Sequence, residues 1–383
     1  MKTQWDYIIA GGGCAGRSLA YQMSLHESLK EKKILIIEKE VKNQNDRTWS
    51  FWESRPGPFE EIVHKRWENA WVHYGCVSRK LKLRPFVYKT ILGKDFYEFT
   101  DKAFQNTTNI SYTNATVHSI DKSGRIISNI GEFEGKWIFS SLLAKPDKVN
   151  PYHWLWQHFY GKVIRTSNPQ FDPNAVTFMD FRVPQIDGTC FMYILPFSET
   201  EALLEFTVFS KDTWAKEQYV EQLEKYIVRH IDCSYEVIEE EMGAIPMTDF
   251  PLKRAEKDSK IIKIGSAGGA SKGSTGYTFS RIQEDAALMA NRLANGDLPL
   301  YSTYFSNSRF RWYDSSLLGL LTEENYSGDQ FFFNLFAKNK TEDIFSFLNE
   351  KTSFGIELKI MSSTPIVKMT VNGFSALNKV FKK

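Results

Sequence analysis

Long apolar runs and paired cysteines are both scarce in this chain of 383 residues. No apolar segment reaches the roughly 18 residues that a membrane-spanning helix needs, so we expect no spanning segment. The N-terminus enters an apolar strand directly, without the pattern of a secretory leader. No two cysteines form a CxxC pair, which argues against a zinc site or a redox dithiol and fits a reducing compartment. The four cysteines are Cys14, Cys76, Cys190 and Cys233.

An excess of either charge is also missing, because 48 basic and 46 acidic residues leave a formal net charge of +2. Lys and Arg are scattered along the chain, so we expect no nucleic-acid partner. Aromatic residues, by contrast, are abundant at 15%, with 29 Phe, 17 Tyr and 10 Trp. Aromatic side chains in this number can fill a core, line a tunnel for a long apolar ligand, or face a cation.

The N-terminal segment has the pattern of a β-α-β unit: an apolar run at 6–10, helical spacing over 17–30 and a second apolar run at 33–37. Further strands are expected at 110–130, 137–143, 175–182, 189–196, 201–210 and 260–265. Helices are expected at 213–231 and 278–293, and the pattern is helical from 299 onward.

A glycine motif follows the first expected strand and precedes the first expected helix. Gly11 permits a tight turn, Gly13 lets the backbone approach a pyrophosphate, and Gly16 lets helix and strand pack closely. Glu38 ends the second strand, where an acid can bind ribose hydroxyls. The alternative is a glycine turn without a ligand, but strand, helix, glycines and terminal acid together predict a dinucleotide site.

A second glycine cluster, between the strand at 260–265 and the helix at 278–293, can offer backbone N–H groups to anionic ligand atoms. Its candidate cofactor-binding residues are Gly265, Gly268, Gly269, Ser274, Thr275 and Gly276. A flexible surface loop is the alternative. Two such clusters favour FAD over NAD, because FAD adds an isoalloxazine to the pyrophosphate. Since only one Rossmann fingerprint is present, no separate nicotinamide domain is expected, although transient use of NAD(P)H stays possible.

These elements predict an α/β protein with a discontinuous, Rossmann-like FAD-binding domain similar to that of aromatic hydroxylases. An antiparallel β-sheet substrate domain and a helical C-terminal part complete it. The expected FAD-binding domain comprises 1–60, 96–150 and 250–298, the substrate domain 61–95 and 151–249, and the helical region 299–383.

The motifs together resemble lycopene cyclases, and the resemblance runs from Asp6 to about Leu293. It rests on DYIIAGGGCAGRSLA, NDRTWSFWE, TFMDFRVPQIDGTCFMYILPFS, ALLEFTVFS and GSAGGASKGSTGYTFSRIQEDA. It implies bound FAD, used in reduced form without net redox turnover, and lycopene drawn from the membrane. The expected products carry β-ionone rings: γ-carotene forms first, and β-carotene forms from it. It also implies a cytoplasmic protein held peripherally at the inner face of the cell membrane.

Plant-type members of this family carry two adjacent acids at the segment that matches 204–207. Here the second position is Phe206, so only Glu205 carries over. A further family aspartate has no match, because residues 139–141 are Phe, Ser and Ser.

Cyclisation of a ψ end group needs a strong acid in a water-poor pocket, a base, and a group that stabilises positive charge. Glu205 lies in a strand that is apolar on both faces, where burial would keep it protonated as a general acid. An ion pair with an arginine such as Arg182 is the alternative. Asp180 and Arg182 share a face of their strand and are expected either to tune Glu205 or to form a structural ion pair.

Two further sites have alternatives as well. Arg47 is a candidate for contact with the flavin phosphates, or else a solvated surface charge. The phenylalanines at 331–336 and 344–348, with nearby lysines, suit an interfacial membrane anchor; the alternative is a helix packed on the body of the protein.

Three other functions share these features. A geranylgeranyl reductase or an aromatic hydroxylase would use the same scaffold but consume NAD(P)H in proportion to product. A non-catalytic flavin- or carotenoid-binding protein would keep the glycine motifs without needing Glu205. Monocyclisation or bicyclisation, ε-ring formation and oligomeric state stay open.

Overall fold

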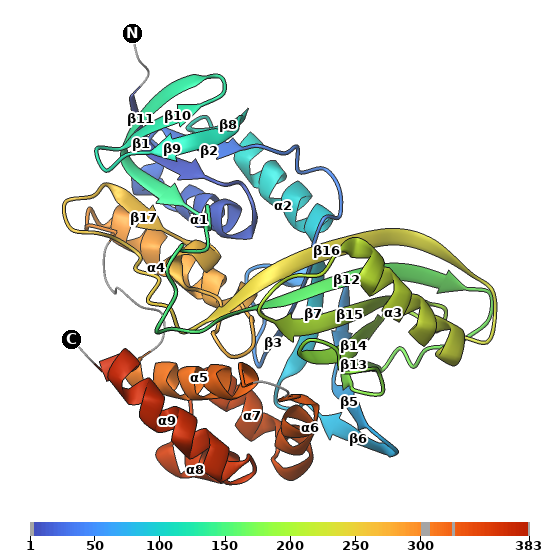
Figure 1. The fold of residues 1–383 in the computed structure, drawn as a ribbon. Helices are drawn as coiled ribbons and strands as arrows, with labels where there is room; N and C mark the ends of the chain where they lie inside the picture. The colour runs from blue at the N-terminus through green and yellow to red at the C-terminus, as the bar shows by residue number, and fades with distance from the viewer. Residues whose placement is uncertain (1–3, 300–306, 324–325, 382–383) are drawn as a thin grey trace.

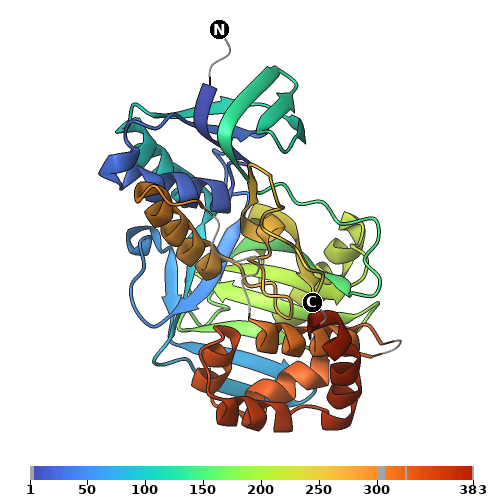
Figure 2. The ribbon, with the colours of Figure 1, turned by 90° about the vertical axis from the view of Figure 1, so that its left-hand side faces the viewer.

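The computed structural model describes residues 4–299, 307–323 and 326–381. Within these ranges the chain forms two seven-stranded sheets, one three-stranded sheet and a group of C-terminal helices. In Figure 1 the first sheet lies at the upper left, the second extends to the right, and the C-terminal helices lie below. Figure 2 shows these parts one above another.

The first sheet has a parallel centre, in which β8, β2, β1 and β11 are neighbours and β17 also pairs with β11. The antiparallel strands β10 and β9 extend it. Its central strands are apolar on both faces because Ile9 and Ile36 pack toward α1 and α4, whereas Ile8 and Ile37 pack with Ile126. The elements are β1 (Gln4–Ala10), α1 (Cys14–Ser24), β2 (Ile34–Glu38), β8 (Ile110–Asn114), β9 (Val117–Ile120), β10 (Arg125–Ser128), β11 (Gly131–Ser140), β17 (Ile261–Lys263) and α4 (Phe279–Ala294).

The second sheet has the order β16-β12-β15-β14-β13-β5-β6 and is antiparallel except for the pair β13–β5. Side chains on its strands alternate between two environments. Leu204, Phe206 and Val208 pack against the helix α3, whereas Leu203 and Phe209 face the C-terminal helices. The elements are β5 (Asn69–Tyr74), β6 (Val77–Lys82), β12 (Trp154–Thr166), β13 (Ala175–Asp180), β14 (Thr189–Pro196), β15 (Glu201–Ser210), α3 (Lys216–His230) and β16 (Tyr235–Thr248).

A small sheet of order β3-β7-β4 joins the two large ones. Its elements and the adjoining helix are β3 (Thr48–Glu53), β4 (Lys65–Trp67), β7 (Val87–Leu92) and α2 (Gly93–Gln105). Strand β3 belongs to the expected FAD-binding segment and β7 to the expected substrate segment, so these two segments share a sheet. The domain boundaries stay a prediction.

The α/β fold class expected from the sequence is confirmed, with a discontinuous first unit, a β-sheet unit and a helical C-terminal part. The expected helices at 213–231 and 278–293 correspond to α3 and α4. The long strands β12 and β16 were not expected, because polar residues interrupt their apolar pattern. The first expected helix ends early: α1 stops at Ser24 and a short 3-10 helix spans Glu27–Leu29.

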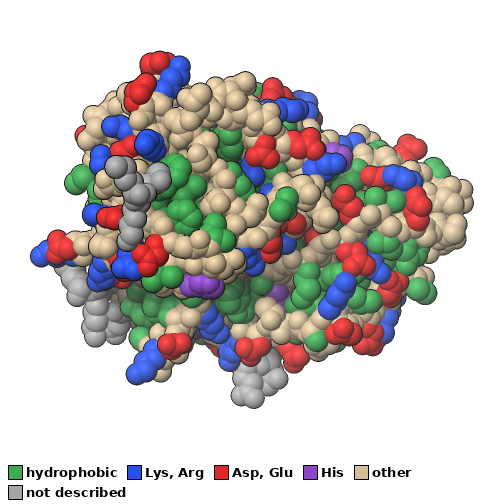
Figure 3. Space-filling model, turned by 90° about the horizontal axis from the view of Figure 1, so that it is seen from above, with side chains coloured by type: hydrophobic (Ala, Val, Ile, Leu, Met, Phe, Trp, Pro, Cys, Tyr) green, Lys and Arg blue, Asp and Glu red, His purple; other side chains and the backbone are tan. Residues whose placement is uncertain are grey.

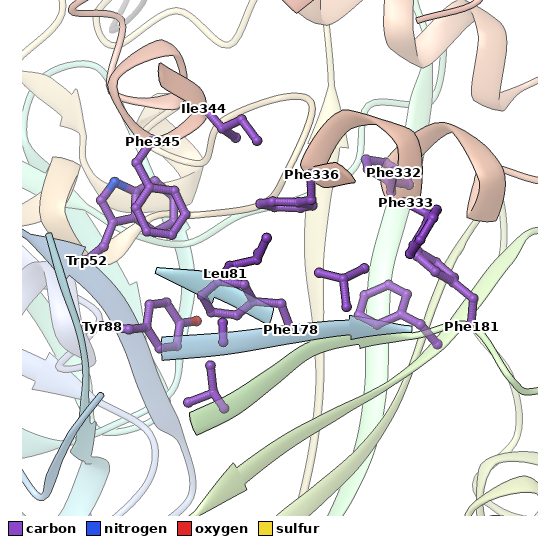
Figure 4. Packing of buried hydrophobic residues seen from close by; sticks show 14 of the residues in the cluster. Trp52, Leu81, Tyr88, Phe178, Phe181, Phe332, Phe333, Phe336, Ile344 and Phe345 are labelled. Carbon is purple, nitrogen blue, oxygen red and sulfur yellow. The ribbon is translucent and has the colours of Figure 1, made fainter. Parts of the chain in front are cut away.

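The C-terminal helices pack onto the second sheet. They are α5 (Ser308–Leu321), α6 (Asp329–Lys338), α7 (Thr341–Leu348), α8 (Phe354–Ser362) and α9 (Ile366–Phe381). Figure 4 shows Phe345 beside Trp52 and Phe336 above Phe178, and the ring centroids of Trp52 and Phe345 are 4.6 Å apart. The interpretation of these phenylalanines as a membrane anchor was wrong, because all of those at 331–333, 336 and 345 are buried.

Candidate active site

The first glycine motif forms a tight strand-to-helix turn. Gly11 has a φ of +104°, and a Cβ on Gly16 would lie 2.1 Å from the carbonyl oxygen of Gly11, so only glycine lets α1 pack this close to β1. A Cβ on Gly13 would have no protein atom within 4 Å. The turn therefore leaves open space at the N-terminus of α1.

Glu38 lies at the carboxyl end of β2, beside this turn. The backbone N–H of Gly12 donates a hydrogen bond of 2.7 Å to Glu38 Oε2, and the Glu38 side chain is buried. The structure therefore brings Glu38 to the glycine motif, at the edge of a parallel sheet where dinucleotides bind in related folds.

The second glycine cluster contacts the first. Gly265 has a φ of +58°, and a Cβ there would lie 2.7 Å from the Cβ of Ala15. Gly268 and Gly269 shape the turn itself: a Cβ on Gly268 would lie 2.4 Å from the carbonyl oxygen of Lys263, and Gly269 has a φ of +86°. Both clusters thus meet at one place in the fold.

A cavity of about 540 Å³, called here the central cavity, begins at these clusters and reaches the second sheet and the C-terminal helices. Gly13, Gly265 and the 274–276 segment line one end. The aromatic part of its wall includes Phe159, Phe178, Phe191, Phe209, Phe332 and Phe336.

The end of the central cavity near the glycines suits a dinucleotide cofactor. Gly13, Cys14 and Ala15 line it at the N-terminus of α1, and no side chain caps that helix end. The buried Gln157 Oε1 and Thr275 Oγ1 both border the cavity and lack a hydrogen-bond partner in the protein. Such atoms call for a ligand partner, so the residues fit the pyrophosphate and polar edges of FAD.

Arg47 lies at the wall of the central cavity. Its guanidinium donates hydrogen bonds to the carbonyl oxygens of Asp46 (2.7 Å) and Met242 (2.8 Å). The structure places Arg47 between the small sheet and β16, and its expected contact with flavin phosphates stays a prediction.

Glu205 faces the central cavity from β15 and is only 6% exposed. Thr207 Oγ1 donates a hydrogen bond of 2.7 Å to Glu205 Oε1. Burial, followed by the nearby carboxylate of Glu241, raises the pKa of Glu205 well above its usual range. Burial at this position therefore favours the neutral, protonated form of the side chain.

Glu241 is a carboxyl group of this site that sequence reasoning missed. It is buried on β16, shares a hydrogen bond with Glu205, and accepts one of 2.7 Å from Thr48 Oγ1. Burial raises the pKa of Glu241 to about 7. Three glutamates run together at 239–241, a pattern typical of a solvated edge, and only the pairing of β16 with β12 shows that the third points inward.

Phe206, where plant-type sequences carry a second acid, faces away from the central cavity. It is fully buried beneath α3, with its ring centroid 5.9 Å from that of Trp214. Because successive side chains of a strand point to opposite faces, an acid at 206 would not reach Glu205 on the cavity side.

Asp180 and Arg182 lie on the α3 face of the sheet, opposite Glu205. Arg182 donates bonds of 2.8 Å and 2.6 Å to Asp180, and Tyr226 of α3 donates a third of 2.7 Å. Burial alone would raise the pKa of Asp180, but these donors lower it. Neither residue lines the central cavity. The geometry supports the structural ion pair and not a catalytic role for these two residues.

Three tyrosines form a hydroxyl cluster in the central cavity. Tyr88 Oη lies 2.7 Å from Tyr193 Oη and 3.3 Å from Tyr277 Oη. Tyr193 is the cross-strand partner of Glu205. Burial raises the pKa of all three phenols, that of Tyr277 to about 12, so they are neutral donors beside the acid.

Solved structures with the same architecture define its class. The chain matches a geranylgeranyl bacteriochlorophyll reductase-like protein from Thermoplasma acidophilum with a TM-score of 0.64 and 13% identity, over 100% of both chains. It matches a flavin-dependent brominase with a TM-score of 0.57 and 12% identity, over 99% of this chain and 95% of the other. The chain therefore shares its fold with these proteins, one of which is a flavin-dependent enzyme.

Within that class, sequence defines the family. The family described as lycopene cyclase protein matches residues 6–372, and the chain belongs to it. It is 25% identical to the chloroplastic lycopene beta cyclase of Arabidopsis thaliana over 75% of this chain and 60% of the relative. It is also 25% identical to the lycopene beta-cyclase of Pantoea ananas, over 65% of this chain and 64% of the relative. The matched region thus spans less than two thirds of either relative's length.

Proposed function

We propose that this protein is an isomerase that binds FAD and cyclises the ψ end groups of lycopene to β-ionone rings by acid catalysis. The observation that carries this proposal is a neutral glutamic acid, Glu205, buried at the wall of an aromatic cavity. Membership of the lycopene cyclase family supports lycopene as the substrate.

FAD would be held by the two glycine clusters. The N-terminus of α1 at Gly13 would hold the pyrophosphate, Glu38 would bind a ribose hydroxyl, and Thr275 with Gln157 would supply further polar contacts. When bound in reduced form, with NAD(P)H as the source of electrons, FAD supplies electron density that stabilises positive charge.

Glu205 would donate its proton to the terminal double bond of the end group. The O–H bond breaks, a C–H bond forms from the alkene electrons, and the neighbouring double bond attacks the resulting cation to close the ring. Because the wall of the cavity carries aromatic rings, ring faces would stabilise the cation. The Glu205 carboxylate left by the first step is a base at the cavity wall that can take a proton from the new ring, which restores the acid and gives a product with the composition of the substrate.

An unchanged product mass is the expected result that separates this function from its rivals. Purified holoprotein incubated with lycopene and a reductant should yield carotenoids of the mass of lycopene, with reductant consumption independent of the amount of product. A geranylgeranyl reductase would add two hydrogens and a hydroxylase would add oxygen. Mass spectrometry of the pigments decides, and a product heavier by either amount would contradict the proposal.

Peripheral binding to the cytoplasmic face of the membrane is part of the proposal, because lycopene is apolar. No helix among the described residues is both long and apolar enough to cross a bilayer. Exposed apolar side chains do occur on α8 and α9; they are Phe354, Leu358, Val367, Val371 and Phe374. The face in Figure 3 carries acidic and basic side chains side by side, with hydrophobic side chains between them. We therefore assign membrane contact to α8 and α9.

The double variant Val371→Glu/Phe374→Glu is expected to bind lipid vesicles about tenfold more weakly, because charged side chains resist burial in lipid. Co-sedimentation with vesicles measures the effect. Leu25→Glu, a matched change of another exposed apolar residue that lies in the first unit, is the control and should bind normally. Equal sedimentation of the double variant and the wild type would remove α9 from the membrane contact.

A further inference from the structure

Glu205 and Glu241 meet across a strand that has no side chain between them. In the second sheet β12 lies between β15 and β16, and Gly161 of β12 is the register partner of both Glu205 and Glu241. The three residues form a row across the sheet and share one face. The outer strands of such a row lie roughly 9–10 Å apart, a distance that two glutamate side chains span together.

Glycine at 161 keeps the path between the carboxyl groups open. A Cβ at this position would lie 3.3 Å from the Cβ of Glu205 and 3.0 Å from a methyl carbon of Leu203. A larger residue would therefore press against Glu205 and Leu203. Glycine inside a strand often marks a place where another group closely approaches the backbone, and Gly161 has that role here.

The two carboxyl groups occupy different positions relative to a substrate. Glu205 lines the central cavity, whereas Glu241 does not and reaches the cavity only through its hydrogen bond with Glu205. The groups that face Glu241 are the hydroxyl of Thr48 and the charges of Arg47 and Glu239.

Glu205 has its own set of neighbours. Thr207 donates a hydrogen bond to it, and the phenols of Tyr193 and Tyr277 lie nearby. Glu241 is the carboxylate that faces it.

Two touching carboxyl groups in a buried site do not ionise together. Burial raises the pKa of both groups, but the hydroxyl of Thr48 and the charge of Arg47 oppose this rise at Glu241, whose pKa is about 7, so Glu241 is the group that loses its proton first as the pH rises. If Glu241 is ionised, proton donation by Glu205 would leave two carboxylates in contact. If Glu241 is neutral, donation leaves one carboxylate that accepts a hydrogen bond from its partner, and this state is the better acid.

We propose that Glu241 is a positioning residue for the proton donor, and that as a neutral acid it donates a hydrogen bond to the oxygen from which Glu205 releases its proton. In that step the O–H bond of Glu205 breaks, its electron pair stays on the oxygen, and the proton forms a C–H bond with the substrate alkene. The role of Glu241 in this step rests on the proposed cyclase function.

Glu241→Gln is the sharp test, because the amide keeps a hydrogen-bond donor but cannot ionise. The wild-type rate should fall roughly tenfold per pH unit above the pKa of Glu241, about 7. Glu241→Gln should stay active, and its rate should not decrease over this pH range. Glu241→Leu, without a donor, should be roughly 10–100-fold slower at every pH, the equivalent of one hydrogen bond to a charged group. Glu240→Gln, a change at the adjacent exposed position of β16, is the control and should keep the wild-type profile.

An infrared titration of the purified holoprotein without lycopene gives a second readout. The wild type should lose one protonated-carboxyl signal as the pH rises through about 7, the pKa of Glu241, and Glu241→Gln should lack that transition. Identical pH–rate profiles for wild type and Glu241→Gln, or the same infrared transition in both, would overturn the inference. If the transition belongs to Glu241 but no protein form cyclises lycopene, the proposed function fails while the carboxyl pair stands. A Glu241→Leu protein that does not fold leaves the glutamine comparison intact.

Discussion

Glu205→Gln is expected to lower the rate of lycopene cyclisation by at least roughly 10²–10⁴-fold, the range typical of general acid catalysis, while the protein keeps its FAD. The amide matches the carboxylic acid in size and can still pair with Thr207, but it has no acidic proton to give to an alkene. The measurement is initial rate per bound FAD, with flavin absorbance as the measure of cofactor content.

The control for this change is Glu201→Gln on the same strand, where the carboxylate is paired with Arg165 at the surface. It should leave the rate unchanged. Glu205→Asp keeps the acid but withdraws it by one methylene, so only a trace of activity should remain. A Glu205→Gln protein that holds FAD and cyclises at the wild-type rate would remove Glu205 from the mechanism. If Glu205 served stability alone, the variant would instead lose thermal stability and flavin together, at constant rate per bound FAD.

Gly13→Val is expected to weaken FAD binding by about 10–100-fold, so that the purified protein loses most of its flavin. No protein atom lies within 4 Å of a Cβ at this position, so the valine fills the space at the N-terminus of α1 that the pyrophosphate needs. The fold itself should tolerate the change. Flavin released on denaturation, and the Kd for added FAD, measure the effect.

Gly355→Val is the matched control, because a Cβ on this glycine of α8 also has no atom within 4 Å but lies far from the glycine clusters. It should keep its flavin. Retention of stoichiometric FAD by Gly13→Val would show that the cofactor does not approach this turn. Gly16→Ala is a different case, because its Cβ would lie 2.1 Å from the Gly11 carbonyl oxygen and should disturb folding itself.

The structure supplies a second acid to the site from a strand other than the one that carries position 206. On β15 the positions 205 and 206 face opposite sides of the sheet, and Phe206 fills the core beneath α3. The second carboxyl group beside Glu205 comes instead from β16, two strands away. A site with two acids is thus present without two adjacent acids in the sequence.

Short sequence patterns were enough to predict the features that depend on residues close together in the chain. The β-α-β unit, both glycine clusters, the helices α3 and α4 and the burial of Glu205 were all expected, because turn geometry and strand periodicity are set by residues a few positions apart. The family resemblance followed from the same segments and is confirmed.

Only the tertiary structure decided which of these segments meet. It buried Phe345 and the phenylalanines of α6 in the core, placed Asp180 and Arg182 on the far face from Glu205, and brought Glu241 to Glu205 across Gly161. Helix packing onto the second sheet causes the first outcome, and strand pairing causes the other two. The register of strand pairing fixes which face of the sheet each side chain lies on. A one-residue shift in the pairing would turn Asp180 or Glu241 to the other side of the sheet.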